Sequence, residues 1–223
     1  MSIAIAIDGP SGAGKSTLAK RLAGEMGYLY VDTGAMFRAV GLYALRAGKD
    51  PADAAAVEAL LPAVALTLAH VDGAQHIYLN GEDVSEAIRQ EQVGMAASAV
   101  AVHPAVRSFL LEQQRAIAST NNVLMDGRDI GTVVLPKATV KIFLTATPEV
   151  RAKRRTDELI AKGQKADYNK ILKDIQQRDY QDTHREIAPL KMARDSVKLD
   201  TSELDIDGVI AAMKEIIARK VTL

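Results

Sequence analysis

The sequence predicts an α/β protein with a five-stranded parallel sheet that helices flank on both faces. Short apolar runs rich in β-branched residues alternate with longer segments of helical periodicity along the 223 residues, as in a parallel sheet covered on both sides. The first of these runs leads through a glycine-rich loop into a helix. A chain of this length forms one domain, or a core with inserts, around a sizeable apolar interior.

The strands and helices follow one another in a regular order. The alternating Ile3, Ile5 and Ile7 predict the first strand, and the stripe begun by Leu18 and Leu22 predicts the helix after the loop. Further strands are expected at residues 28–32, 122–126, 139–146 and 196–201. Further helices are expected within residues 33–48, 52–63, 85–120 with a break at His103-Pro104, from Thr147 onward, 168–185 and 205–220.

Residues 63–84 differ in character from the rest of the chain. Short apolar runs are separated there by Asp72-Gly73 and Asn80-Gly81, which are dipeptides typical of tight hairpin turns. The pattern predicts short antiparallel strands, and an antiparallel patch inside an α/β chain indicates an insert.

The composition narrows the classes of function. The 28 basic and 28 acidic side chains give a formal charge of zero, whereas a general nucleic-acid binder usually carries a basic excess. There are no cysteines, which excludes disulfides and fits a reducing cytosol. The N-terminus meets Asp8 too soon for a signal peptide, and no apolar stretch is long enough to span a membrane. We expect a soluble cytoplasmic protein that binds neither nucleic acid nor membrane.

The glycine-rich loop matches the pattern G-x-x-x-x-G-K-[ST] between a strand and a helix, which is the context this motif requires. Its glycines let backbone N–H groups turn inward around phosphate oxygens, with the helix N-terminus behind them. Lys15 supplies a cation to the outer phosphates, and the Ser16 hydroxyl can ligate Mg²⁺. A chance glycine-rich turn is the alternative, and the strand–loop–helix context argues against it. The predicted phosphate loop consists of Gly9, Pro10, Ser11, Gly12, Ala13, Gly14, Lys15, Ser16 and Thr17.

Asp126-Gly127-Arg128-Asp129 directly follows an apolar strand. An acid at a strand end near a phosphate loop can organise Mg²⁺ and its waters, and an arginine there can bind phosphate. A surface turn stabilised by its aspartates is the alternative, but the position at the carboxyl end of a strand favours a functional role.

Two charged clusters remain ambiguous from spacing alone. Arg151, Lys153, Arg154 and Arg155 could surround a phosphoryl group in transfer or form a solvated helix face. The steps of four and three predict that a second set shares one helix face, where it could bind a nucleotide or form a surface ladder of ion pairs. The members of this second set are Arg178, Asp182 and Arg185.

Taken in order, these segments carry a recognisable pattern. They include "IDGPSGAGKST", "DTGAMFRAV", "YLNGEDVSEAIR", "AASAVAVHPAVR", "DGRDIGTVV", "KIFLTA", "RAKRR" and "RDYQDTHREIAPL". The chain resembles the bacterial cytidylate kinases, members of the nucleoside monophosphate kinase family of P-loop kinases, along nearly its whole length. The first segment alone would indicate only a phosphate loop, whereas the ordered set is specific.

The resemblance implies Mg²⁺-dependent transfer of the γ-phosphoryl group of ATP to CMP or dCMP, in pyrimidine nucleotide metabolism, by a monomer. It implies a single kinase domain with a short helical lid. The core is expected at about 1–32, 102–150 and 167–223, the monophosphate-binding insert at about 33–101, and the lid at about 151–166.

The resemblance also implies roles for individual residues. It assigns the cytosine ring to Thr33, Arg107, Asp129 and Arg185, the sugar to Ser98, Arg178 and Asp182, and the acceptor phosphate to Arg38 and Arg128. It assigns catalysis to Lys15, Arg128, Arg151, Arg154 and Arg155. Relatives vary between glycine and serine or threonine at Ser16, and the serine in this chain allows a direct contact of its hydroxyl with Mg²⁺, with Asp126 acting through water. Many relatives have serine at Thr33 and tyrosine at Phe37; threonine keeps the hydroxyl, whereas phenylalanine lacks the one that tyrosine carries.

Two other functions compete with this interpretation. A small-metabolite kinase of similar fold would phosphorylate a hydroxyl and need a carboxylate base, for which Asp32 is the candidate. A regulatory module would bind ATP without turnover. The segments typical of cytidylate kinases argue against the first, and the number of arginines around a second site argues against the other.

Overall fold

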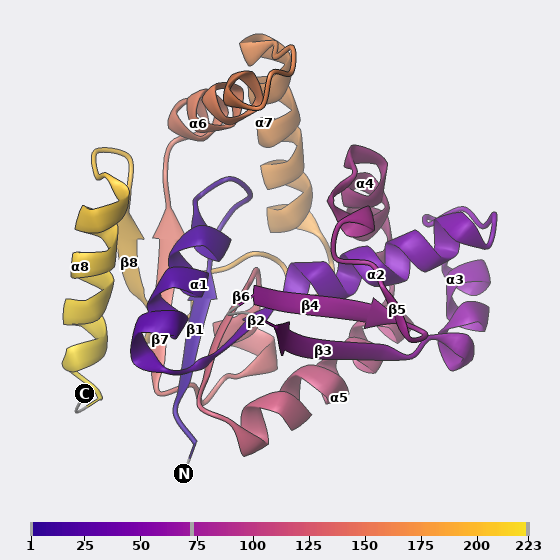
Figure 1. The fold of residues 1–223 in the computed structure, drawn as a ribbon, viewed down its shortest axis with the longest axis horizontal. Helices are drawn as coiled ribbons and strands as arrows, with labels where there is room; N and C mark the ends of the chain where they lie inside the picture. Colours follow the sequence, from indigo (N-terminus) through magenta and orange to yellow (C-terminus); the bar gives the residue numbers. More distant parts are fainter. Residues whose placement is uncertain (1, 72–73, 222–223) are drawn as a thin grey trace. The chain divides into compact units, whose positions relative to one another are not determined.

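The computed structural model describes residues 2–71 and 74–221 (Figure 1). The Asp72-Gly73 turn expected from the sequence lies outside the described residues. The chain divides into two compact units, which are treated separately below. The first comprises Met1–Leu29 with Asn122–Leu223, and the second comprises Tyr30–Asn121.

A five-stranded sheet with the order β2-β6-β1-β7-β8 confirms the predicted fold class. Its strands are β1 (Ala4–Asp8), β2 (Leu29–Asp32), β6 (Val123–Gly127), β7 (Val140–Thr145) and β8 (Val197–Asp200). β1 pairs in parallel with both β6 and β7, and β7 pairs in parallel with β8. Because a central parallel strand is covered on both faces, Ile5, Ala6 and Ile7 are wholly buried.

Capping residues mark several ends of the helices in the first unit. They are α1 (Lys15–Met26), α6 (Pro148–Ala161), α7 (Tyr168–His184) and α8 (Ile206–Ala218), with a π-helical turn, η3, at Ile130–Val134. Gly27 ends α1 in the left-handed conformation. Thr147 caps α6 ahead of Pro148, at the helix start that the sequence predicted, and Asp167 caps α7.

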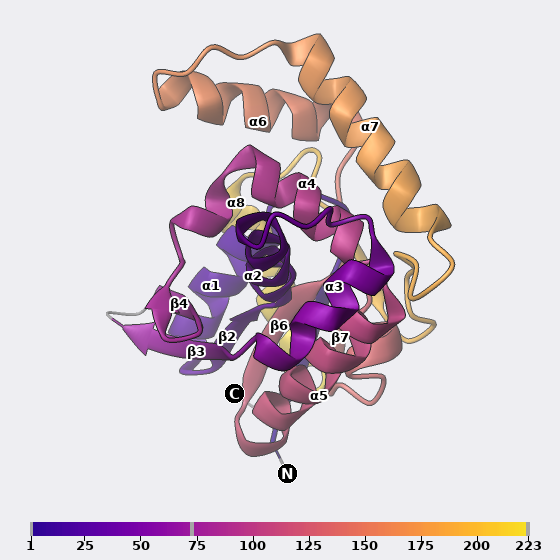
Figure 2. The same cartoon turned by 90° about the vertical axis from the view of Figure 1, so that its right-hand side faces the viewer.

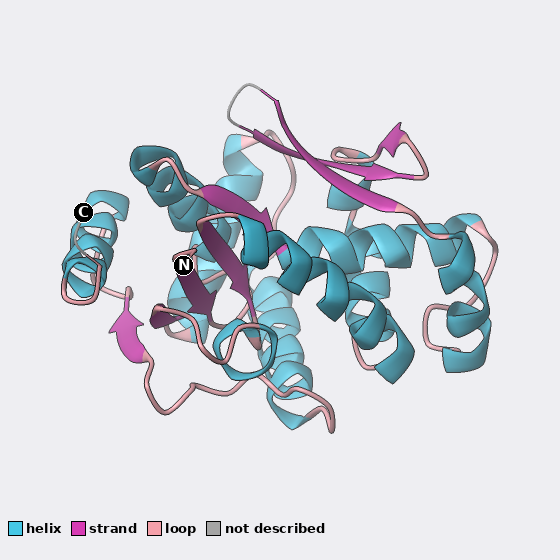
Figure 3. Cartoon of the chain, turned by 90° about the horizontal axis from the view of Figure 1, so that it is seen from below, coloured by secondary structure: helices cyan, strands magenta, loops and turns pink. Residues whose placement is uncertain are grey.

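The second unit combines helices with a small antiparallel sheet. Its helices are α2 (Thr33–Arg46), α3 (Ala54–Leu60), α4 (Glu91–Val100) and α5 (Pro104–Thr120), with 3₁₀ turns η1 (Leu61–Ala63) and η2 (Ala87–Arg89) (Figure 2). The sheet contains β3 (Leu66–Val71), β4 (Ala74–Leu79) and β5 (Glu82–Asp83), and it confirms the predicted antiparallel patch (Figure 3).

Close helix packing organises this second unit. A Cβ at Gly41 would lie 3.0 Å from the backbone of Ala96, so the absence of a side chain lets α2 approach α4. Met36, Val40 and Val93 are buried in the same apolar cluster. α2 starts directly at Thr33 rather than after a loop, because the Asp32 carboxylate accepts from the Ala35 N–H and caps the helix.

Within the described residues, no single helix combines the length and apolarity needed to cross a membrane, although α4 and α5 together would pass that test as a pair bent by 100°.

Candidate functional site

The predicted phosphate loop connects β1 to α1 with glycines where the backbone needs them. A Cβ at Gly9 would lie 2.0 Å from the carbonyl oxygen of Leu144, so no other residue fits against β7 there. Gly12 and Gly14 have φ angles of 74° and 84°, in the left-handed region. The loop thereby turns toward the start of α1, where backbone N–H groups are available for an anion.

Lys15 is the first residue of α1 and is buried in this loop. Its Nζ donates to the Pro10 carbonyl oxygen at 2.7 Å. Burial lowers the pKa of Lys15 well below its ordinary value, and the positive charge of Arg128 lowers it further. A phosphate bound here would reverse this effect, since an anion favours the charged ammonium.

Ser16 and Asp126 come together across the parallel pair of β1 and β6. The Ser16 Oγ donates to Oδ2 of Asp126 at 3.0 Å, and Asp126 is buried near the end of β6. A hydroxyl and a carboxylate are the oxygen ligands that suit Mg²⁺, which commonly keeps its waters and takes few protein ligands. The described residues contain no group of three or more His, Cys, Asp or Glu side chains that could hold a metal by themselves.

The loop after β6 carries Arg128 and Asp129 and is anchored to β1. The buried Asp8 carboxylate accepts from the Ile130 N–H and the Gly131 N–H, each at 2.7 Å. Sequence reasoning did not single out Asp8, because the residues that bind it lie more than a hundred positions along the chain. Its place at the carboxyl end of β1, directly before the phosphate loop, is the signal that could have indicated it.

Arg128 and Asp182 form an ion pair between this loop and α7. The Arg128 Nε lies 2.8 Å from Oδ2 of Asp182. Burial alone would raise the pKa of Asp182, but the attraction of Arg128, with Arg178 and Arg185, holds it below its ordinary value. The predicted set on α7 therefore joins the Asp126–Asp129 loop in one charged cluster.

Arg185 lies just beyond α7, since the helix ends at His184. Its Nη2 is 3.6 Å from Oδ1 of Asp129, and its Nε donates to the Ala188 carbonyl at 2.7 Å. The helix thus ends one residue before the predicted Arg185. The arginine still meets the same carboxylates, because as the C-cap residue it donates its N–H to the Gln181 carbonyl at 3.1 Å and so keeps its helical place.

The three arginines predicted for the lid differ in their surroundings. Arg151 is buried, and its guanidinium donates to the Asp179 carboxylate and to the carbonyls of Ser11 and Ala146. Arg154 donates to the Thr201 carbonyl at 2.6 Å and to its hydroxyl at 3.1 Å. Arg155 is exposed and pairs with Glu158 along α6.

The second unit holds the remaining predicted site residues, each described within that unit. Arg38 Nη2 lies 2.8 Å from Oδ2 of Asp32. Arg107 donates to the Ala101 carbonyl, and its guanidinium carbon lies 5.5 Å from the centre of the Phe37 ring. Thr33 is buried at the start of α2, and the half-buried Ser98 on α4 donates to the Gly94 carbonyl at 3.4 Å.

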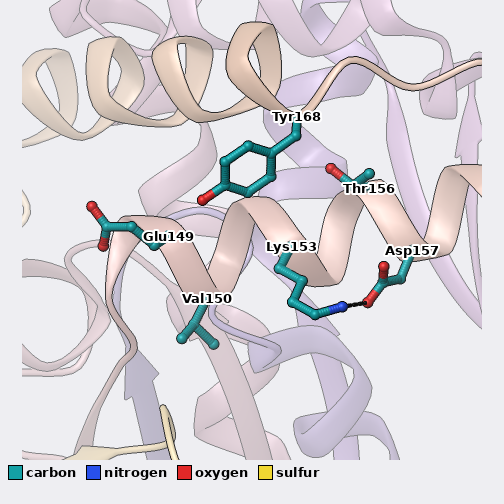
Figure 4. Close-up of a pocket in the computed structure, with 6 residues that line it drawn as sticks. All are labelled: Glu149, Val150, Lys153, Thr156, Asp157 and Tyr168. Atoms are coloured by element: carbon teal, nitrogen blue, oxygen red, sulfur yellow. Dashed lines mark hydrogen bonds and ion pairs between the residues drawn. The ribbon is translucent and has the colours of Figure 1, made fainter.

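Two cavities open within the first unit. The larger, of about 460 Å³, lies along α6 and the start of α7, and Lys153 is the one member of the basic cluster that lines it. Figure 4 shows its lining: Glu149, Val150, Lys153, Thr156, Asp157 and Tyr168. The smaller, of about 350 Å³, includes Pro10, Arg151 and Asp179. The smaller cavity therefore adjoins the predicted phosphate loop.

Comparison with known proteins decides the family. The family model described as "Cytidylate kinase" matches residues 5–219. The chain belongs to the cytidylate kinase family. It is 50% identical over 216 residues to a cytidylate kinase of Pelotomaculum thermopropionicum, covering 96% of this chain and 94% of that protein. It is 49% identical over 214 residues to one of Caldicellulosiruptor bescii, covering 96% and 95%. Cytidylate kinases are nucleoside monophosphate kinases, so this chain is a phosphotransferase.

A solved structure supports the fold. A shikimate kinase of Bacteroides thetaiotaomicron superposes with a TM-score of 0.51 at 15% sequence identity, covering 97% of this chain and 98% of that one. At this identity the likeness concerns the fold alone. The sheet and helices of this chain thus share their fold with that kinase.

Proposed function

We propose that this enzyme transfers the γ-phosphoryl group of ATP to CMP or dCMP and releases ADP with CDP or dCDP. The observation that carries the proposal is the match to the cytidylate kinase family over residues 5–219. The phosphate loop and the charged cluster around Arg128 and Asp182 supply the groups that such a reaction needs.

The phosphate loop, Gly9 to Thr17, is the proposed ATP site. Its backbone N–H groups and the N-terminus of α1 would hold the phosphate oxygens, and Lys15 would exchange its bond to the Pro10 carbonyl for the outer phosphates. Ser16, with Asp126 acting through water, would hold Mg²⁺. When bound, Mg²⁺ neutralises charge on the phosphates.

The residues that bind CMP are proposed for each unit in turn. On the first unit, Arg128 would bind the acceptor phosphate, and the acidic and basic partners around it would bind the sugar and base. Those partners are Asp129, Arg178, Asp182 and Arg185. On the second unit, Arg38 would bind the acceptor phosphate, Ser98 the sugar, and Thr33 and Arg107 the base.

The chemistry requires positioning more than proton transfer. The attacking oxygen belongs to a phosphate that is already anionic at neutral pH, so no general base is needed. Catalysis then depends on alignment, on neutralising charge that spreads over the transferring group, and on excluding water. Lys15 and Arg128 would act with the lid arginines, Arg151, Arg154 and Arg155, in neutralising that charge.

An acceptor-dependent assay tests the proposal. ADP release would be measured with ATP, with and without Mg²⁺, and with CMP, dCMP, UMP, AMP or shikimate as acceptor. We expect turnover with CMP and dCMP that depends on Mg²⁺, and little with the other three. Preference for shikimate would favour a small-metabolite kinase, and binding of ATP without turnover of any acceptor would favour a regulatory module.

The proposal extends to organisation and location. Residues 33–101 would act as the monophosphate-binding part and residues 151–166 as a lid that closes over ATP. The enzyme would act as a cytoplasmic monomer in pyrimidine nucleotide metabolism, without nucleic-acid or membrane partners, and the zero formal charge supports the lack of a nucleic-acid partner. Sedimentation equilibrium would test the monomer.

A further inference from the structure

Asp8 is a buried carboxylate to which the family resemblance gives no role. Its side chain leaves the end of β1 one residue before the phosphate loop, and Asp8 is 2% exposed. Oδ1 accepts from the Ile130 N–H and Oδ2 from the Gly131 N–H, both at 2.7 Å. Short bonds from two consecutive N–H groups to the two oxygens of one carboxylate fix both the position and the orientation of the backbone that donates them.

The backbone held in this way directly continues the loop that carries Arg128 and Asp129. Ile130 is the residue after Asp129, and it begins the π-helical turn η3. The carbonyl of Asp129 accepts from the Val133 and Val134 N–H groups of that turn. The Asp8 carboxylate therefore fixes the first N–H groups of η3, and later N–H groups of the same turn fix the carbonyl of Asp129.

Gly131 shows how closely the two parts fit. A Cβ at this position would lie 3.1 Å from Oδ2 of Asp8 and 3.1 Å from Cδ of Lys141. The contact thus leaves no room for a methyl group without a shift of the carboxylate or of the lysine. The geometry of the contact between Asp8 and Gly131 can therefore be changed in two independent ways. A substitution of Asp8 alters it from β1, and a substitution of Gly131 alters it from the loop.

We propose that Asp8 is a positioning residue for the acceptor nucleotide: by binding the Ile130 and Gly131 N–H groups it sets the places of Arg128 and Asp129 relative to the phosphate loop. This inference rests on the proposed function, in which Arg128 binds the acceptor phosphate and Asp129 reads the base. In this role Asp8 acts through the backbone that it binds and not by contact with a nucleotide. A carboxylate that only stabilised the fold would have no effect on the choice between bases.

The test compares Asp8→Asn with Gly131→Ala. Asparagine keeps one acceptor oxygen but turns an amide N–H₂ toward a backbone N–H, so one bond is lost and a repulsion replaces it. For Asp8→Asn we expect the KM for CMP to rise about tenfold and the CMP-to-UMP ratio of kcat/KM to fall about tenfold, with the KM for ATP changed less than about threefold. Gly131→Ala should act in the same direction, and the double variant should show less than the sum of the two effects.

Two controls make the outcome decisive. Met213→Ala, in the buried face of α8, loses stability without touching the loop, and its CMP-to-UMP ratio should equal that of the wild type. Asp129→Asn tests the underlying assignment, since its amide cannot accept from the amino group of cytosine. If Asp129→Asn alters the ratio while Asp8→Asn and Gly131→Ala leave it unchanged, the positioning role is refuted and the proposed function stands. If wild type shows no preference for CMP, the proposed function fails instead.

Discussion

The Arg151 guanidinium holds the Asp179 carboxylate by two nitrogen–oxygen contacts, which join α6 to α7, while the same guanidinium donates to the Ser11 carbonyl of the phosphate loop. The Arg151 side chain is only 3% exposed and that of Asp179 is 23% exposed. One arginine thus connects the start of the proposed lid, the predicted phosphate loop and the helix that carries Asp182. Asp179 had no predicted role, because its partner lies 28 positions away on another helix.

Asp179→Ala should therefore destabilise the fold. Removing one partner leaves a buried cation without its carboxylate, and we expect a loss of about 2–3 kcal/mol in the free energy of unfolding, measured with urea. Asp157→Ala is the matched control, since it breaks the exposed Lys153–Asp157 pair on α6 and should cost under about 0.5 kcal/mol. Equal effects of the two variants would contradict the special role of the buried pair.

Lys15→Ala should abolish phosphoryl transfer. The fixed positive charge at the outer phosphates is lost, and such contacts contribute several kcal/mol to the transition state, so kcat should fall by at least about 10³-fold. Lys20→Ala, at an exposed position on the same helix, should keep normal kcat. If the folded Lys15→Ala variant turned over CMP at a near-normal rate, the assignment of residues 9–17 as the phosphate loop would be wrong.

Asp182→Ala should raise the KM for CMP about tenfold and leave that for ATP nearly unchanged. The substitution removes the proposed sugar contact and releases Arg128 from its ion pair. Steady-state kinetics with each substrate varied in turn provide the measurement. The exposed Asp174 on the same helix offers the control, and Asp174→Ala should behave as wild type. If Asp182→Ala had the same KM for CMP as the wild type, this part of α7 would have a purely structural role.

Arg154→Ala should lower kcat more than it changes the KM of either nucleotide, because its charge counts most while the phosphoryl group is in transfer. In the structure Arg154 binds the Thr201 carbonyl and hydroxyl. If the role of Arg154 were purely structural, the variant would have lower stability and a normal kcat. Urea unfolding alongside kinetics separates the two. Lys153→Ala, exposed on the same helix, should change neither quantity appreciably.

Asp8 should give the wild type a distinctive dependence of stability on pH. Burial raises the pKa of Asp8 to about 6, against the hydrogen bonds from Gly131 and Ile130, which lower it. A folded-state pKa above the unfolded value favours the protonated folded form, so this stabilisation is complete below about pH 4 and is lost as pH rises through 6. Relative to Asp8→Asn, the wild type should lose about 2 kcal/mol between pH 4.5 and 6.5, measured by urea unfolding. A constant difference between the two proteins would contradict the raised pKa.

Local sequence patterns predicted most of the fold because the features they report are local. Alternating isoleucines, the glycine-rich loop and the Thr147-Pro148 helix start each depend on residues a few positions apart, and the structure contains all of them. Apolar periodicity likewise predicted the five strands and the antiparallel patch. Boundaries were predicted less closely: the first strand begins at Ala4 rather than Ile3, and α2 ends at Arg46, within the predicted range of 33–48.

The candidate site was harder to predict, since its contacts join distant segments. Asp8 meets Ile130, Arg151 meets Asp179, and Arg154 meets Thr201, and no spacing rule relates such pairs. Arg185 illustrates the limit of periodicity. Its spacing from Asp182 fits a helix, and as the C-cap residue it keeps the helical bond to Gln181, but no spacing rule indicates that its guanidinium meets Asp129.

None of the residues of α7, all of which the structure describes, is buried. Its links to the rest of the first unit include the ion pairs Arg151–Asp179 and Arg128–Asp182. The heat capacity of unfolding grows with exposed apolar surface and falls with exposed polar surface. Ile171, Leu172 and Ile175 of α7 are half-buried, so detachment of this helix exposes apolar as well as polar surface. The two contributions to its heat capacity have opposite signs and partly cancel, so the docking enthalpy of α7 varies less with temperature than that of an equally large, purely apolar contact.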